Sequence, residues 1–192
     1  MNPYGVLAGT IGLVAVGWLV FRKVRADYRQ YSQLTQLSVF LEFLIFGLHG
    51  CASYLFLDSN LSDIQMAGFT FWLAVCLMAF GLAGVLTGMA RLSWMKAIGR
   101  DAGGLQTSGL YRFTRNPQLV AYGLLVLGYA LLWPSWSGMV WVAVYGVIAH
   151  IMVLTEEEHL RSVYGADYEA YCQRTPRYLG LPARDRQTLK RT

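Results

Sequence analysis

A polar stretch between two apolar runs, residues 103–119, carries the side chains of this sequence that are best suited to chemistry. It reads GGLQTSGLYRFTRNPQL and holds Arg112, Arg115 and Asn116 close together, directly before Pro117 opens the next apolar run. A plain connection between two membrane helices needs only about 2–8 residues. Glycine, aromatic, guanidinium and amide groups at this point indicate a site where a small polar ligand lies at the edge of a bilayer.

Three consecutive carboxylates, residues 156–158, form the second candidate group. They directly follow the apolar run 138–155, and the run before it is 119–133. The Trp-Pro-Ser-Trp turn between the two runs predicts an antiparallel hairpin, whose ends bring the carboxylates next to Pro117. Carboxylates, an arginine, an amide and several tyrosines at a membrane edge suit a zwitterionic or cationic cofactor that reaches toward a lipid-soluble substrate.

Each of these groups also has a purely structural interpretation. Arg115 suits the cytoplasmic end of a span, and residues 156–158 suit the solvated first turn of a surface helix. His150, in the last apolar run, is either a base or a histidine held inside the bundle. Glu42 and His49, seven residues apart, lie on one helical face, where ionisable groups are either functional or paired within the bundle.

Composition indicates an integral membrane protein with a single domain, residues 1–192. The chain is 55% hydrophobic and only 14% charged, whereas soluble domains carry about 25% charged residues. The net charge of +5 does not indicate nucleic acid as a partner, because the basic residues alternate with apolar runs and form no continuous face. The three cysteines are widely spaced and two lie in apolar runs, so we expect neither a disulfide nor a metal site.

Five apolar runs predict an all-α fold: an integral membrane helical bundle of about five transmembrane helices with a cytoplasmic C-terminal amphipathic helix. Runs of this kind can cross the hydrocarbon core of about 30 Å, although the short hairpin 119–155 could instead be partly re-entrant. After the last run, apolar and aromatic residues recur at helical spacing, with an interruption at Gly165. The predicted spans are 4–21, 37–57, 66–90, 119–133 and 138–155, and the predicted cytoplasmic helix is 156–173.

The distribution of basic residues predicts the orientation. All 16 Lys and Arg residues lie in the three segments 22–36, 91–117 and 156–192, which share one side of the membrane in a five-span arrangement. Under the positive-inside rule these segments are cytoplasmic. We therefore place the N-terminus outside and the C-terminus in the cytoplasm, and we assign the protein to the inner (plasma) membrane of a bacterium.

Two motifs resemble the signature of one superfamily of integral membrane methyltransferases, which includes the isoprenylcysteine carboxyl methyltransferases and the phospholipid methyltransferases. GLYRFTRNPQ, residues 109–118, is similar to G-x-Y-x-x-x-R-(H/N)-P-x-Y. EEEHLRSVYGADYEAY, residues 156–171, is similar to E-E-x-x-L-x-x-x-(F/Y)-G-x-x-Y-x-x-Y, and Arg177 matches a basic residue that usually follows. The resemblance covers about residues 80–178.

This resemblance implies a five-span enzyme that uses S-adenosylmethionine at the cytoplasmic face. The acceptor would be a lipid or an amphiphilic small molecule, such as a phospholipid amine, a prenylated or small thiol, or a carboxylate. Four residues are candidates for the reaction. The resemblance gives Arg115, Asn116 and Glu157, and His150 is added as a candidate base. Those that it places around the cofactor are Leu105, Gln106, Tyr111, Asn116, Pro117, Gln118, Leu119, Glu156 and Glu157.

Two departures from the pattern bear on the acceptor. Leu119 stands where the motif has its final Tyr, and Met152 stands where the isoprenylcysteine enzymes have an Arg that resembles a reader of the substrate carboxylate. An amine, thiol or hydroxyl acceptor is therefore left open. Two other functions also remain: a non-catalytic lipid-binding or assembly protein on the same scaffold, and an NADPH-dependent membrane reductase. The oligomeric state does not follow from the sequence.

Overall fold

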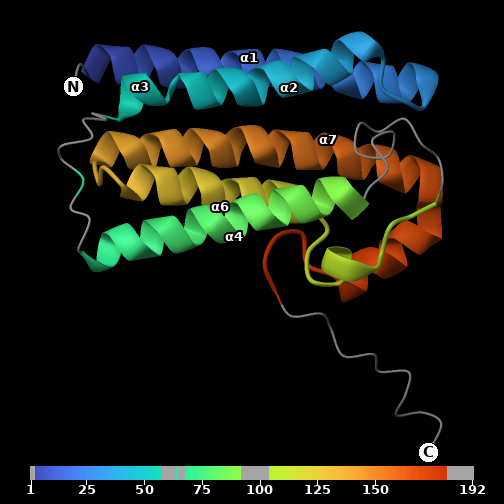
Figure 1. Cartoon of the computed structure of the whole chain (residues 1–192). Helices are drawn as coiled ribbons and strands as arrows, with labels where there is room; N and C mark the ends of the chain where they lie inside the picture. Colours follow the sequence, from blue (N-terminus) through green and yellow to red (C-terminus); the bar gives the residue numbers. More distant parts are fainter. Residues whose placement is uncertain (1–2, 58–63, 65–67, 92–103, 181–192) are drawn as a thin grey trace, which may run out of the picture.

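The computed structural model describes residues 3–57, 64, 68–91 and 104–180, with 88–91 described by their backbone only. All regular secondary structure in these ranges is helical. Figure 1 shows the α1–α2 pair on one side of α7, with α6 and α4 on the other side. The elements are α1 (Pro3–Tyr31), α2 (Gln36–Cys51), α3 (Ser53–Phe56), α4 (Phe69–Arg91), η2 (Gly109–Arg112), α6 (Pro117–Leu131) and α7 (Trp136–Arg174).

Helix length and composition confirm the all-α membrane bundle. Four described helical segments are long and apolar enough to cross a bilayer: Pro3–Tyr31, Gln36–Phe56, Phe69–Thr87 and Trp136–Arg174. The fourth predicted span corresponds to α6, which has 15 residues. At 1.5 Å per residue it is about 22 Å long, shorter than a hydrocarbon core of about 30 Å.

Glycines bring α4 and α6 into close contact. A Cβ atom added to Gly81 of α4 would lie 2.6 Å from the carbonyl oxygen of Ala121 in α6. One added to Gly128 of α6 would lie 2.7 Å from the carbonyl oxygen of Ala74 in α4. Without a hydrophobic driving force between helices in lipid, close backbone packing of this kind supplies much of the attraction. These glycines therefore explain how α4 attaches to the bundle.

Polar side chains join α1 and α2 to each other and to α7. Asp27 of α1 is 2% exposed and accepts hydrogen bonds from the backbone N–H of Thr35 (3.1 Å) and from Ser38 Oγ of α2 (2.6 Å). Near the other end of α2, His49 is fully buried and stacks on Trp141 of α7, with 4.8 Å between the ring centroids. The Trp141 indole N–H donates to the His49 carbonyl oxygen at 2.9 Å. The sequence left the role of His49 open, and the structure shows that His49 joins α2 to α7.

α7 continues without a stop from the predicted fifth span into the predicted cytoplasmic helix. Ser135 caps its start and accepts a hydrogen bond from the backbone N–H of Gly138 at 3.1 Å. The helical path is broken at Gly165, whose φ of 49° and ψ of −119° suit a residue without a side chain. Beyond Gly165 the helix turns toward η2, as Figure 1 shows. The break therefore positions the last part of α7 against the first motif.

Candidate functional site

The two motifs meet at a buried carboxylate. Glu157 of α7 is 2% exposed, and its Oε1 atom lies 2.9 Å from Nη1 of Arg115 in the first motif. Arg177 adds two hydrogen bonds to the same carboxylate, at 2.8 and 2.9 Å, and Arg161 adds one at 3.1 Å. Three guanidinium groups offset the cost of burying one carboxylate, and they keep it ionised. Glu157 thus joins the first motif, α7 and the chain that follows α7.

That following chain, residues 175–178, lies against the first motif as a strap. The carbonyl oxygen of Pro176 accepts from the Arg115 backbone N–H at 3.0 Å. The carbonyl oxygen of Arg177 accepts from Asn116 Nδ2 at 2.9 Å and from Thr114 Oγ1 at 3.2 Å. The hydrogen bond to Glu157 raises the pKa of the Arg177 guanidinium further above its ordinary value. The side chain of Asn116 therefore holds the strap in this structure.

The neighbouring carboxylate, Glu156, has different surroundings. Its side chain is half-buried. Burial raises the pKa of the Tyr111 hydroxyl well above its ordinary range, and the negative charge of Glu156 raises it further. Tyr111 is held in place through its carbonyl oxygen, which accepts from Tyr171 Oη at 2.7 Å. The structure thus brings Tyr111 of the first motif into contact with Tyr171 of the second motif.

The third carboxylate, Glu158, faces α1. Its oxygens lie 3.1 Å from Nε of Arg25 and 2.6 Å from Nη2 of Arg29. The next residue, His159, stacks on Tyr28 of α1 at 4.0 Å between ring centroids. Successive residues on a helix are separated by about 100°, so the three glutamate side chains face different parts of the structure.

His150 does not lie with the carboxylates. Its side chain is exposed, and its Nδ1 atom is 2.6 Å from the hydroxyl oxygen of Tyr178 in the strap. It precedes Glu157 by seven residues, about 10 Å along the helix axis and on nearly the same face. The strap therefore runs along α7 from Glu157 to His150. No sequence pattern identified Tyr178, because its role depends on how the strap folds back.

The start of α6 offers free backbone donors. Asn116 is the N-cap residue with φ −129° and ψ 59°, and neither its side chain nor another caps the helix. Pro117 occupies the first turn and has no N–H, so the backbone donors left at this helix start are the N–H groups of Gln118 and Leu119. An uncapped helix N-terminus attracts a carboxylate through these groups and through the helix dipole.

The beginning of the first motif lies at the periphery. Leu105 is half-buried, and Gln106 is exposed with its Nε2 atom donating to Ser108 Oγ at 2.9 Å. Residues 92–103, which precede them, lie outside the described part of the chain. The hydrogen bond of the Gln106 side chain is thus made within the first motif and not to a carboxylate of α7.

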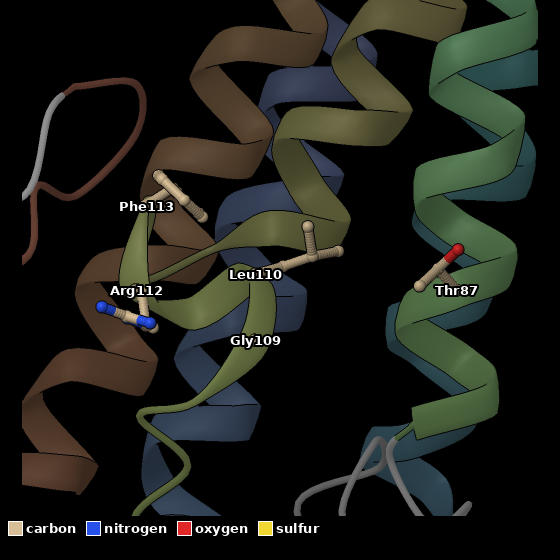
Figure 2. A pocket seen from close by; sticks show the side chains of 5 residues that line it. All are labelled: Thr87, Gly109, Leu110, Arg112 and Phe113. Carbon is tan, nitrogen blue, oxygen red and sulfur yellow. The ribbon is translucent and has the colours of Figure 1, made fainter.

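A cavity of about 350 Å³ lies between the first motif and α4. Figure 2 shows Leu110 projecting from η2 toward Thr87 of α4, while Arg112 extends to the other side of the turn. Its lining is mainly apolar, and the residues around it are Thr87, Gly109, Leu110, Arg112 and Phe113. A hydrocarbon chain matches such a lining better than a polar ligand does.

The fold and the site define an integral membrane helical bundle with a polar site where its α6–α7 hairpin meets the first motif. The model of the phospholipid methyltransferase family matches residues 69–167, more than half of the chain. The chain belongs to this family and is a membrane methyltransferase by that membership. The match includes both motifs up to residue 167 and leaves α1, α2 and α3 outside. Comparison with curated proteins and with solved structures gave no significant match.

Proposed function

We propose that this protein transfers a methyl group from S-adenosylmethionine to a lipid-borne amine at the cytoplasmic face of the membrane. The observation that carries the proposal is the ion pair of Arg115 with Glu157, which joins the two motifs directly before the uncapped start of α6 and directly after Glu156. Membership in the phospholipid methyltransferase family supports the reaction type. The positive-inside distribution of Lys and Arg supports the cytoplasmic location.

The residues present fit the cofactor at three points. The free N–H groups of Gln118 and Leu119 suit its carboxylate. The Glu156 carboxylate suits its ribose hydroxyls or its positive charge, and the ring of Tyr111 suits its sulfonium. When bound, the cofactor supplies a methyl group on positively charged sulfur. Glu157, Arg115 and Asn116 are engaged with one another and with the strap, and we assign them to positioning this site.

The distribution of charges favours an amine as the acceptor. The arginines around the second motif are already paired with Glu157 and Glu158, whereas Arg112 of the first motif has no ion pair among the described residues. Within the described residues, Glu156 has no ion-pair partner, so its carboxylate is available to a cationic group. A bound ammonium group complements this charge, whereas a carboxylate acceptor would be repelled. Met152, in place of a basic residue, agrees with this preference.

A lipid acceptor is supported by the cavity beside Leu110. Its apolar lining can take an acyl chain, and Arg112 can pair with an anionic phosphate of the headgroup. The residues of the chain would then bind the headgroup, orient the amine and exclude water. Positioning and exclusion of water are the main contributions that a protein makes to such a transfer.

Calorimetry on the purified protein in detergent tests the cofactor assignment. We expect S-adenosylhomocysteine to bind, and labelled S-adenosylmethionine with a lipid extract to label an aminophospholipid fraction. Absence of binding at high micromolar concentration would refute the proposed enzyme. Label in a thiol or fatty-acid fraction instead of an aminophospholipid would refute the amine acceptor alone.

A second function, a non-catalytic lipid-binding protein on the same scaffold, is favoured by two observations. The strap occupies Asn116 and Glu157 in this structure, and Leu119 stands in place of the motif tyrosine. This function predicts that Asn116→Ala and Glu156→Ala leave the biological phenotype intact. Loss of the phenotype in protein that still inserts would exclude it.

A further inference from the structure

Tyr145 of α7 is hydrogen-bonded to the backbone of α6 near the start of that helix. Its hydroxyl donates to the carbonyl oxygen of Leu119, with 2.5 Å between the two oxygen atoms. Tyr145 is only 6% exposed, and Leu119 is the third residue of α6. A hydroxyl group buried in apolar surroundings is costly unless it has such a partner. The bond therefore joins the first turn of α6 to α7.

A glycine of α6 lets the Tyr145 ring come close. A Cβ atom added to Gly123 would lie 3.1 Å from Cε1 of Tyr145, closer than ordinary van der Waals contact. Gly123 follows Leu119 by four residues, so both lie on the same face of α6. A helical carbonyl oxygen accepts from the N–H group four residues on, and its second lone pair remains for the tyrosine hydroxyl. Gly123 and Leu119 together therefore form the surface that receives Tyr145.

Neighbouring aromatic rings fix the direction of the Tyr145 side chain. The ring of Tyr122 in α6 lies 5.3 Å away, measured between centroids, at an angle of 66°. From α2, the rings of His49 and Phe46 lie 5.7 and 6.2 Å away. Aromatic pairs at about 4.5–7 Å attract one another beyond the area that they bury. The ring is therefore held from two helices, and a phenylalanine at this position would keep its packing.

The same face of α7 leads from Tyr145 to Glu156. Eleven residues separate the two, which corresponds to about three turns and 20°, and to about 16 Å along the helix axis. Tyr145 contacts α6 on this face, at the residue whose N–H group is one of the free donors of the helix start. The bond therefore sets the position of these donors relative to the helix that carries Glu156.

We propose that Tyr145 is a positioning residue for the methyl transfer, because it holds the start of α6 where the N–H groups of Gln118 and Leu119 receive the carboxylate of the cofactor. The inference rests on the proposed function, which assigns that carboxylate to these donors. Tyr145 acts through the backbone of Leu119 and touches neither cofactor nor acceptor. Leu119 stands where the related motif has a tyrosine, and Tyr145 brings a hydroxyl group to this residue from α7.

The experiment compares Tyr145→Phe with wild type in nanodiscs. We expect the Kd of S-adenosylhomocysteine to rise about three- to tenfold, the range for the loss of one neutral hydrogen bond. With phosphatidylethanolamine and labelled S-adenosylmethionine, kcat should fall about tenfold, because small displacements of bound groups slow such a transfer. The melting temperature should stay close to that of wild type, since the ring remains. A merely structural role predicts a lower melting temperature with unchanged cofactor affinity.

Tyr122→Phe is the matched control for the loss of a hydroxyl group. The Tyr122 hydroxyl belongs to the same aromatic cluster but lies toward α2, 3.7 Å from a Cβ atom added to Gly50. This variant should bind S-adenosylhomocysteine as wild type does.

Gly123→Ala provides a second, independent variant. It would displace the Tyr145 ring and keep its hydroxyl, so it should also weaken binding of S-adenosylhomocysteine. Added to Tyr145→Phe, it should weaken binding no further, because there is no hydroxyl left to displace. Gly146→Ala, whose Cβ atom meets nothing within 4 Å, is the control for placing alanine in a helix. Fully additive effects of Gly123→Ala and Tyr145→Phe would contradict the inference.

Hydrogen–deuterium exchange measures the contact without turnover or cofactor. The peptide to follow covers residues 117–124, which include the carbonyl group that Tyr145 binds. We expect faster exchange in Tyr145→Phe than in wild type, because the start of α6 is then held less firmly to α7. Tyr122→Phe should exchange as wild type does.

The outcomes separate this inference from the proposed function. Wild-type protein that neither binds S-adenosylhomocysteine nor transfers methyl groups refutes the function and with it the role of Tyr145 in the reaction, while the exchange comparison still decides whether Tyr145 holds α6. An active wild type with a Tyr145→Phe variant within about twofold of its Kd and about threefold of its kcat overturns the inference alone. So does a variant that melts lower but binds S-adenosylhomocysteine normally.

Discussion

The three consecutive glutamates of α7 have different partners, because successive side chains leave the helix in different directions. Glu157 is buried among arginines, Glu158 pairs with α1, and Glu156 forms no ion pair with a described residue. Sequence and resemblance marked Glu156 and Glu157 alike as cofactor contacts. Geometry separates them, because Glu157 already has three charged partners and Glu156 has no ion-pair partner among the described residues.

Glu156→Gln is expected to lose affinity for S-adenosylhomocysteine by about tenfold to a hundredfold. A charge-assisted hydrogen bond contributes about 1.5–3 kcal/mol, which corresponds to that range. Gln keeps the size of the side chain, so folding and membrane insertion should not change. The matched control is Glu158→Gln, which should bind nearly normally. A silent Glu156→Gln together with a damaging Glu158→Gln would contradict the site assignment.

Glu157→Ala is expected to reduce the free energy of unfolding by about 3–5 kcal/mol, the typical cost of leaving buried charges without their partner. Arg115, Arg161 and Arg177 would lose their common counter-charge. Denaturant titration of the purified protein in detergent measures the change. Glu158→Ala is the comparison, since its carboxylate is exposed and its pairs contribute about 0–1 kcal/mol. If the two variants were equally stable, the buried ion pairs of Glu157 would not stabilise the fold.

At the level of elements, the contacts that build the site are made by short segments and helix ends. The strap, residues 175–178, attaches to the first motif through backbone carbonyls, and α6 attaches to α4 through glycines. The spacing of hydrophobic residues along the sequence predicts neither contact. That α6 is the helix packed against the glycines of α4 followed only from the fold.

Gly81→Ala is expected to destabilise the protein by about 1–3 kcal/mol, the usual cost of overpacking. Its new methyl group would lie 2.6 Å from a backbone oxygen of α6, which cannot move aside as a flexible side chain could. Gly47→Ala on α2 is the control, because a Cβ there meets nothing within 4 Å. Thermal unfolding in detergent compares the two, and the prediction fails if Gly81→Ala melts no lower than Gly47→Ala.

Leu110→Trp is expected to raise the KM for a phospholipid acceptor severalfold while the Kd of S-adenosylhomocysteine stays unchanged. The larger side chain would fill part of the 350 Å³ cavity between η2 and α4. The measurement is steady-state kinetics with phosphatidylethanolamine in nanodiscs. A change in cofactor affinity with an unchanged KM would assign this cavity to the cofactor instead.

For the whole molecule, we propose an outside N-terminus and a cytoplasmic C-terminus in a bacterial inner membrane. In this orientation Glu156 and Tyr111 face the cytoplasm, where S-adenosylmethionine is made. An N-terminal epitope tag should react with antibody in intact spheroplasts, and a C-terminal green fluorescent protein should fluoresce. A tag that reacts only after the membrane is permeabilised would reverse the orientation and the location of the site.

The sequence by itself determined the class of fold and the family, because apolar runs of membrane length and two motifs are local patterns. It also identified most of the groups that meet at the site, including Arg115, Tyr111 and Glu156. Only the tertiary structure decided how they are distributed. A step of one residue turns a helical side chain by about 100°, so the neighbour of each glutamate depends on how α7 packs. The stack of Tyr28 on His159 likewise exists only because α1 packs against α7.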